Sequence, residues 1–220
     1  MGVMRKRSYD QHCSVARALD VVGERWTLLM VRELLTGPKR FKDLLEGLPG
    51  IGTNLLAARL KLLEGHGILR RATLPPPAGS KVYELTGVGL ALEPVVMALS
   101  RWGLGLLGSP GGGDDLRPTW AMVAVRAGLD LSAASDVVCE TYEFRVTGEV
   151  FHVRVRDGEA EAWQGPASEP DLIVSGDTQA FLALASGQLE PADAIQSGSI
   201  RIEGDHNALA RCLKLFGLSA

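Results

Sequence analysis

The chain has 220 residues, a length that fits one large domain or two small domains. Hydrophobic residues make up 46% of it and charged residues 22%, which excludes a disordered or collagen-like chain. The net charge of −3 hides an uneven distribution: residues 1–108 carry 15 Lys and Arg against 9 Asp and Glu, and residues 109–220 carry 8 against 17. The halves therefore have net charges of +6 and −9. Because binding to a polyanion requires a local excess of cations, only the first half is expected to bind nucleic acid.

The sequence also bears on the location of the protein. The longest apolar stretch, residues 85–107, contains two charged residues and a proline, so no membrane insertion is expected. The chain starts without the apolar core of a signal peptide, and we therefore predict a cytoplasmic protein. The three cysteines are far apart and are not spaced with the four histidines as metal ligands are. We expect free thiols, no metal site and no cofactor.

A glycine-rich run near residue 110 lacks apolar anchors and predicts a linker. We expect an N-terminal domain at 1–108, a linker at 109–118 and a C-terminal domain at 119–220. The first is predicted to be a winged helix-turn-helix, and the second an α+β domain with an antiparallel sheet. The whole chain is therefore expected to be α+β.

Apolar spacing in the basic half predicts four helices and then a hairpin with a proline-rich tip. These elements are expected at residues 14–22, 24–35, 41–48, 51–66, 68–74 and 81–85. Thr86 is expected to cap one further helix, which has more apolar surface than a small domain needs to cover its own core.

The fourth helix is the candidate recognition helix. Its Leu56, Leu60 and Leu63 fall on one face, whereas Asn54, Ala58 and Lys61 fall on roughly the opposite face. Small and polar outward residues suit insertion into a DNA groove. Three helices, this fourth helix and then a hairpin are typical of a winged helix-turn-helix.

Several separated motifs of residues 10–103 resemble the HxlR family of bacterial winged-helix transcription regulators. The motifs are Ala18-Leu19-Asp20-Val21-Val22-Gly23, Arg25-Trp26-Thr27, Arg32-Glu33-Leu34, Leu48-Pro49-Gly50-Ile51, Arg59-Leu60-x-x-Leu63-Glu64, Tyr83-x-Leu85-Thr86 and Trp102-Gly103. The resemblance implies a homodimer, with the first and last helices of this half at the interface. It also implies that two recognition helices bind double-stranded DNA at a near-palindromic operator.

The resemblance and the outward face together give the candidate DNA-binding residues. They are Lys39, Arg40, Thr53, Asn54, Ala57, Arg59, Lys61, Arg71, Ser80 and Lys81. Asn54 is suited to reading adenine, and the cations to holding the phosphate backbone. For Arg59 an intramolecular salt bridge is the alternative, and solvated charges are the alternative for Lys61, Arg70 and Arg71.

Cys13 is a candidate redox sensor. It lies at the start of the first helix, near Arg17 and three further cations, and both settings favour the reactive thiolate. Some members of the HxlR family sense quinones or other electrophiles with a cysteine at this position. The alternative is a small buried apolar residue. Cys139 and Cys212 lie in apolar sequence and are expected to be inert.

The acidic half predicts a helix, antiparallel strands and then further helices and a strand. The elements are expected at residues 120–127, 142–147, 150–156, 159–164, 171–175, 177–185, 191–197, 199–203 and 205–216. The phrases at 171–177, 181–184 and 198–205 resemble the sterol carrier protein-2-like fold over about residues 119–218. That fold is associated with an apolar cavity for hydrophobic molecules.

The candidate ligand-binding residues are large apolar side chains that are expected to point inward. They are Trp120, Tyr142, Phe144, Phe151, Val153, Trp163, Phe181, Leu184, Leu213 and Phe216. Tyr142 and Trp163 are also candidates for a polar group that orients a ligand. Ordinary core packing is the alternative for all of them, because core and cavity lining have the same pattern.

These observations predict a dimeric DNA-binding regulator, a repressor, whose C-terminal domain binds a small hydrophobic effector that alters operator affinity. The alternative is a regulator that senses electrophiles through Cys13, with the C-terminal domain as a ligand-free dimerisation or partner-binding scaffold. The chain contains no G-x-S-x-G elbow, P-loop or H-E-x-x-H motif, so no enzyme is expected.

Overall fold

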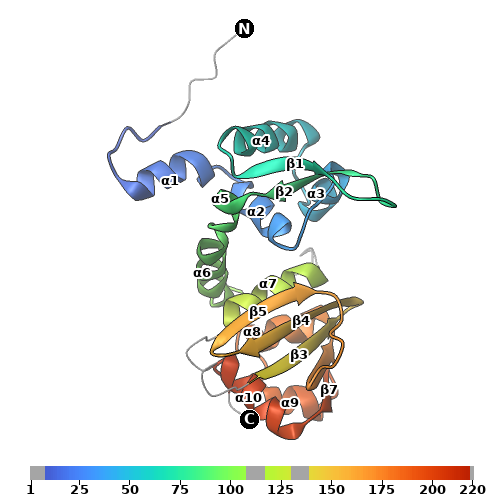
Figure 1. The fold of residues 1–220 in the computed structure, drawn as a ribbon. Helices are drawn as coiled ribbons and strands as arrows, with labels where there is room; N and C mark the ends of the chain where they lie inside the picture. The colour runs from blue at the N-terminus through green and yellow to red at the C-terminus, as the bar shows by residue number, and fades with distance from the viewer. Residues whose placement is uncertain (1–7, 108–116, 130–138, 219–220) are drawn as a thin grey trace. The chain divides into compact units, whose positions relative to one another are not determined.

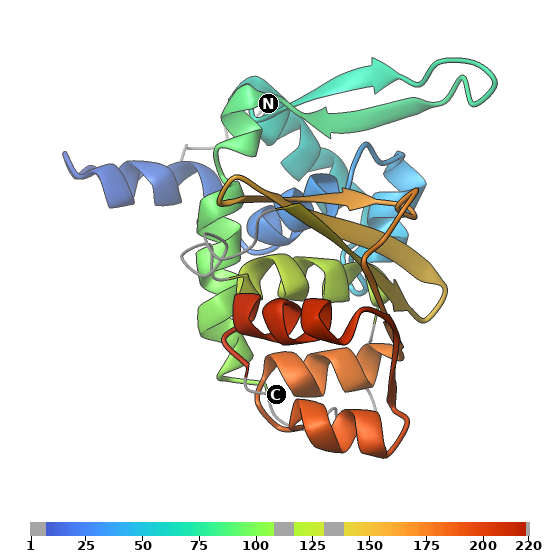
Figure 2. The same cartoon turned by 60° about the horizontal axis from the view of Figure 1, so that its bottom comes forward.

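The computed structural model describes residues 8–107, 117–129 and 139–218, which fall into two compact units, Met1–Val96 and Met97–Ala220 (Figures 1 and 2). Each unit combines helices with a sheet, and the α+β class is confirmed. The predicted linker lies outside the described residues except for its last two positions.

The first unit follows the predicted order of helices and then a hairpin. Its elements are α1 (Ser14–Val22), α2 (Thr27–Leu35), α3 (Phe41–Gly47), α4 (Thr53–Gly65), β1 (Leu69–Thr73), β2 (Lys81–Leu85) and α5 (Gly87–Leu90). The strands β1 and β2 pair antiparallel, with Leu69 opposite Leu85. α1 begins and ends at the predicted residues, as does β2.

The core of the first unit holds α4 in place. Leu56, Leu60 and Leu63 are fully buried, as their spacing predicts, and they pack in one cluster with Met30 of α2 and Leu44 of α3. The opposite face of α4 is thereby left to solvent.

The last helix of the first half differs from the prediction because it is broken in two. Thr86 does cap a helix, since its hydroxyl accepts a hydrogen bond from the N–H of Gly89 at 3.2 Å. That helix, α5, ends after one turn, and two residues separate it from α6 (Glu93–Leu104). Pro94 explains the break, because proline has no N–H for a continuing helix but fits the first turn of a new one. The boundary between the units falls inside α6.

The second unit is a five-stranded sheet with helices. Its remaining elements are α7 (Pro118–Gly128), β3 (Cys139–Val146), β4 (Glu149–Arg156), β5 (Glu159–Gln164), β6 (Leu172–Gly176), α8 (Thr178–Ala185), α9 (Pro191–Gln196), β7 (Ile200–Gly204) and α10 (His206–Leu215). The strand order is β5-β4-β3-β6-β7. The prediction was an antiparallel sheet. The observed sheet is mixed, because β6 lies beside β3 and pairs with it in parallel.

The two faces of this sheet differ. Figures 1 and 2 show α7, α8, α9 and α10 on one face, and the inward residues Tyr142, Phe144 and Val146 of β3 are buried beneath them. The other face carries charged side chains such as Arg154 and Arg156, which are exposed. The apolar interior of the second unit therefore lies between the sheet and the helices.

Candidate functional site

The exposed face of α4 is the first candidate site. Thr53, Asn54, Ala57 and Lys61 are all exposed, and Gly52 caps the helix start. Side chains at the start of such a helix reach base edges when it enters the major groove. The structure therefore leaves these four predicted DNA-binding residues accessible.

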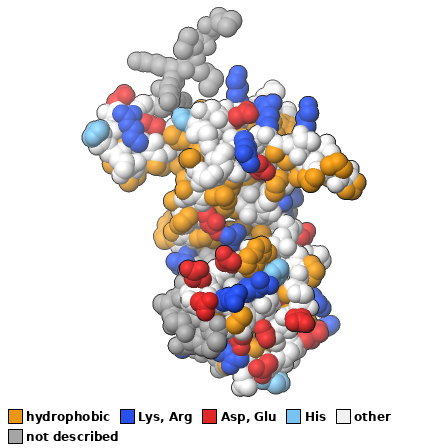
Figure 3. Space-filling view, in the orientation of Figure 1, with side chains coloured by type: hydrophobic (Ala, Val, Ile, Leu, Met, Phe, Trp, Pro, Cys, Tyr) orange, Lys and Arg blue, Asp and Glu red, His pale blue; other side chains and the backbone are white. Residues whose placement is uncertain are grey.

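Cations surround this face. Figure 3 shows Lys and Arg side chains gathered over α4 and the β1–β2 hairpin. Arg40, Arg71 and Lys81 are exposed, and Lys39 and Ser80 are half-buried. Arg71 also forms an ion pair with Glu64 at 3.3 Å, and Ser80 donates a hydrogen bond to the carbonyl of Ala78. These contacts are exposed to water, so they hold the two side chains only weakly.

Arg59 has a different setting. Its Nη2 lies 2.8 Å from Oε2 of Glu24, and only 19% of its side chain is exposed. Its Nε is buried and has no hydrogen-bond partner among the described residues. The intramolecular salt bridge that the sequence left open for Arg59 is thus present.

The turn before α4 is held by an aromatic contact. Gly50 has a φ of 90°, which favours glycine, and a Cβ at this position would lie 3.7 Å from the ring of Trp26. Trp26 itself has a φ of 80° at the start of α2, and the guanidinium of Arg25 lies 5.2 Å from the centre of its ring. The Pro49-Gly50 turn that leads into α4 therefore lies beside Trp26, the residue before α2.

The second candidate site is an apolar cavity of about 110 Å³ in the second unit. Its walls come from α7, α8, α9, α10 and the strands β3, β6 and β7. The lining residues are Ala124, Val125, Gly128, Phe144, Val174, Phe181, Leu184, Ala185, Pro191, Ile195, Ile200, Ile202, Leu209, Cys212, Leu213, Phe216 and Leu218. None of them carries a charge, and the Cys212 thiol is the only side-chain group among them with a polar hydrogen.

Half of the predicted ligand-binding residues line this cavity. Phe144, Phe181, Leu184, Leu213 and Phe216 do so, and Phe144 meets the rings of Phe181 and Phe216 edge to face at 6.2 and 5.9 Å. The cavity also takes residues that the ten predicted positions omit, such as Ile200 and Ile202 of β7. Their alternation along a strand was the available signal.

The other five predicted residues do not line it: Trp120, Tyr142, Phe151, Val153 and Trp163. Tyr142, Phe151 and Val153 are fully buried core residues, the alternative that the sequence left open. Trp163 lies on the outer face of the sheet, 40% exposed and stacked on His152. It therefore cannot orient a ligand in the cavity.

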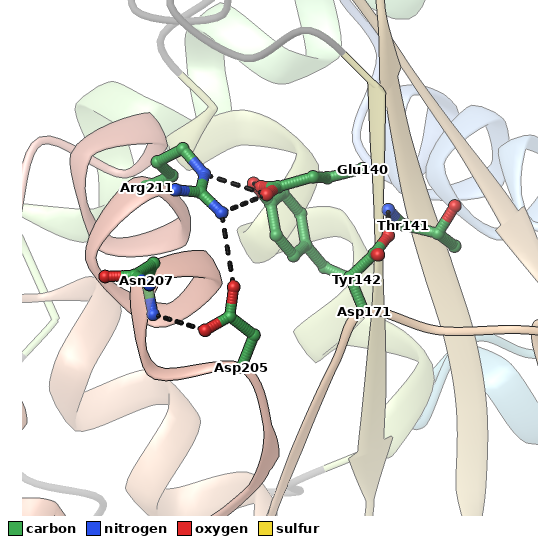
Figure 4. Close-up of polar contacts among 7 residues, drawn as sticks. All are labelled: Glu140, Thr141, Tyr142, Asp171, Asp205, Asn207 and Arg211. Carbon is green, nitrogen blue, oxygen red and sulfur yellow. Dashed lines mark hydrogen bonds and ion pairs between the residues drawn. The ribbon is translucent and has the colours of Figure 1, made fainter.

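A polar cluster ties α10, which lines the cavity, to the first residues of β3 (Figure 4). Arg211 donates two hydrogen bonds to Glu140 and lies 3.6 Å from Asp205, the residue that caps α10. The hydroxyl of Tyr142 donates to the same carboxylate of Glu140. Burial, together with this hydrogen bond, raises the pKa of Tyr142, so the phenol stays neutral. The cluster holds α10 against the sheet.

The three thiols have different surroundings. Cys13 is exposed and not buried, and it precedes α1, whose free N–H groups of Ala16 and Val15 lower the pKa of the thiol. Cys212 is buried, and burial raises its pKa to about 12. Cys139 is exposed at the start of β3, which corrects the apolar setting predicted from the sequence.

Two further observations concern metals and membranes. Among the residues that the structure describes, no three or more His, Cys, Asp or Glu side chains are grouped as metal ligands would be. None of the described helices has the length and apolar character needed to cross a membrane.

Comparisons with known proteins agree with both units. The model of the HxlR-like helix-turn-helix family matches residues 21–109, and the model of the SCP-2 sterol transfer family matches residues 126–216. The HTH-type transcriptional regulator YodB of Bacillus subtilis is 40% identical over 85 residues, which are 39% of this chain and 76% of YodB. The chain belongs to the HxlR family. This HxlR chain also carries an SCP-2 domain, as its sequence predicts, and is a DNA-binding regulator.

Other proteins also match only the HxlR part of the chain. The HTH-type transcriptional regulator sll1512 of Synechocystis sp. is 36% identical over 91 residues, 41% of this chain and 67% of that protein. Among solved structures, the redox regulator HypR in its reduced form shares 32% identity over 41% of this chain and 90% of its own, with a TM-score of 0.38.

Proposed function

We propose that this HxlR chain is a homodimeric regulator that binds double-stranded DNA at a near-palindromic operator through α4 and responds to a small apolar effector bound in the second unit. The observation that carries the proposal is the pairing of an exposed polar recognition face with a separate apolar cavity in one chain. The two features meet the two requirements of a ligand-controlled regulator. The assignment as a repressor stays a prediction.

Exposed apolar residues support the dimer. Val95, Leu99 and Trp102 lie at i, i+4 and i+7 of α6 and are 49%, 47% and 68% exposed. On α1, which Figure 1 shows projecting from the rest of the first unit, Val15 and Leu19 are 64% and 40% exposed. Two helices with apolar stripes of this kind suit burial against a second copy of the chain.

The lining of the cavity supports an apolar effector. This lining has no charged group and only the Cys212 thiol as a weak hydrogen-bond donor, so it favours a hydrocarbon or aromatic group, because a buried polar group without a partner costs free energy. Cavities of about 150 Å³ with similar walls bind a benzene ring. The cavity of about 110 Å³ therefore suits a small ring or a short aliphatic chain.

α6 offers a route between the two functions. It is one continuous helix that begins in the first unit and ends in the second. Within the second unit, Arg101 of α6 donates a hydrogen bond at 2.9 Å to the carbonyl of Ala127 in α7, and Ala124, Val125 and Gly128 of α7 line the cavity. An effector shifts the balance between a DNA-binding state and a non-binding state only as far as its affinities for the two states differ. A change in the position of α7 between the states would alter the cavity wall and so produce such a difference in effector affinity.

Native mass spectrometry of the full chain tests this proposal. We expect a dimer that releases an apolar compound on denaturation. Adding that compound, or toluene as a defined probe, should change the Kd for a duplex that the chain itself selects from a random-sequence library. A monomeric mass would contradict the dimer. An unchanged Kd with every apolar probe would contradict the effector and favour the scaffold alternative.

Cys13 supports a second candidate, a response to electrophiles. Its thiol is exposed and accessible to a reagent, and its lowered pKa favours the reactive thiolate. Alkylation at the start of α1 would act on a helix that we assign to the dimer interface. Operator affinity that is unchanged after complete modification of Cys13 would exclude this role.

A further inference from the structure

Arg59 lies on α4 but not on the face that α4 exposes. At 100° per residue, Arg59 is about 150° around the helix axis from the middle of the face formed by Asn54, Ala57, Ala58 and Lys61. All four of those residues are exposed, whereas only 19% of the Arg59 side chain is exposed. A groove that receives the exposed face therefore meets the side of α4 away from Arg59.

The partner of Arg59 comes from a distant part of the first unit. Glu24 directly follows Gly23, the residue that ends α1, and stands two residues before Trp26 at the start of α2. The 2.8 Å ion pair therefore joins α4 to the turn between α1 and α2, across 35 positions of sequence.

We propose that Glu24 and Arg59 are positioning residues for DNA binding, and that Arg59 makes no contact with DNA. This inference rests on the assignment of α4 as the recognition helix. The three buried leucines hold α4 on one side, and the ion pair restrains rotation of the helix about its own axis. A guanidinium that turned toward a phosphate would break this pair and release that restraint.

A charge exchange separates positioning from contact. The full chain is compared with E24Q, R59M and the exchanged double variant E24R/R59E, on the duplex selected by the unmodified chain from a random-sequence library. D157N is the matched control, because Asp157 pairs with Arg156 at 3.7 Å in the second unit and not in the unit that contains α4. K61M is the reference for loss of a cation on the exposed face. Kd is measured over a range of salt concentrations, and thermal unfolding is measured in parallel.

We expect E24Q and R59M each to weaken binding about tenfold, as loss of a charged hydrogen bond would, and E24R/R59E to recover most of that loss. K61M should reduce the slope of log K against log salt by about 0.9, as loss of one phosphate contact does. D157N should leave Kd unchanged. Failure of the exchange to recover binding, with a slope reduction of about 0.9 in R59M, would show a direct phosphate contact and overturn the proposal.

A purely structural role is also distinguishable. In that case the variants would unfold at lower temperature, but the folded protein would bind DNA with the unmodified Kd, which would equally overturn positioning. If the unmodified chain selects no duplex at all, the assignment of α4 fails, and this outcome is separate from any difference among the variants.

Discussion

The surroundings of single residues have their clearest effect on the pKa values of the thiols. Cys13 meets the free N–H groups at the start of α1, and these stabilise the thiolate. Cys212 faces an apolar cavity, where burial raises the pKa of the thiol to about 12 and keeps it protonated. We therefore expect the same functional group to react readily at Cys13 and slowly at Cys212.

Alkylation should separate these two thiols. With iodoacetamide at neutral pH, Cys13 should be labelled rapidly, and the midpoint of its rate against pH should lie below that of N-acetylcysteine, because its pKa is lowered. Cys212 should be labelled only as fast as the second unit opens. Peptide mass spectrometry reads both rates, and urea-unfolded chain, in which the two should react alike, is the control. A Cys13 midpoint at or above that of the free thiol contradicts this expectation.

Cys212 should also make stability depend on alkaline pH. Between about pH 9 and 12 the unfolded thiol loses its proton while the folded thiol keeps it, so the unfolded state binds fewer protons and stability falls as pH rises. The slope is about 1.4 kcal/mol per pH unit for one group. C212A should lack this contribution, so the stability difference between the two proteins should shrink with rising pH. Urea denaturation measures both stabilities. If the stability difference between the two proteins stays constant across this pH range, Cys212 does not titrate in this way.

Among the helices, α5 is short and contains two glycines whose α-carbons have different surroundings. A Cβ on Gly89 would lie 2.1 Å from the carbonyl oxygen of Ile68, which is a backbone atom that cannot move aside freely. A Cβ on Gly87 would meet nothing within 4 Å. The close approach of α5 to the residue before β1 therefore requires glycine at one position only.

This pair gives a matched stability test. G89A should lower the free energy of unfolding of the first unit by about 1–3 kcal/mol, the usual cost of overpacking. G87A should be neutral or stabilising by up to about 1 kcal/mol, because it removes freedom from the unfolded chain. Chemical denaturation measures both. Equal stabilities for the two variants would be inconsistent with this packing of α5.

Much of the fold was accessible from sequence because its periodicities are strong. The spacing of Leu56, Leu60 and Leu63 predicted the buried face of α4, and the same helical arithmetic places Arg59 away from the exposed face. Trp163 was also predictable as outward. The two-residue turn after Arg156 sets Arg156 opposite Glu159, and that register sets Trp163 opposite the outward His152.

The cavity itself was not predictable. Tyr142 and Phe144 both point inward from β3, yet only Phe144 lines the open space. Alternation identifies the side of a sheet on which a residue lies, but the distance between the sheet and each helix decides whether that side is filled. The parallel pairing of β6 with β3 is a similar case, because it depends on long-range topology.

In the whole molecule, α6 is one uninterrupted helix that contains the boundary between the two units. Its first residues belong to the unit that contains α4, and its last residues to the unit with the cavity. Near the end of α6, the carbonyl of Leu107 accepts a hydrogen bond at 2.8 Å from Gln188, which follows α8. Together with the bond from Arg101 to Ala127, this fixes the end of α6 within the second unit.

Under the proposed function, Arg101 should carry part of the coupling between effector and operator. R101M removes the hydrogen bond to the carbonyl of Ala127 but touches neither the cavity lining nor α4. It should leave the Kd for DNA without effector and the Kd for effector without DNA unchanged. The change in DNA affinity on adding effector, typically about 1–3 kcal/mol in allosteric proteins, should fall to less than about half its value.

The matched control for this test is R156M, which removes an exposed arginine from the outer face of the sheet, where it pairs with Asp157 at 3.7 Å. R156M should retain the full coupling. Coupling is reciprocal, so titrating effector into the DNA complex must give the same coupling free energy as titrating DNA into the effector complex. An R101M chain with unchanged coupling in both titrations would show that the effector acts on DNA binding by a route other than the contact between α6 and α7.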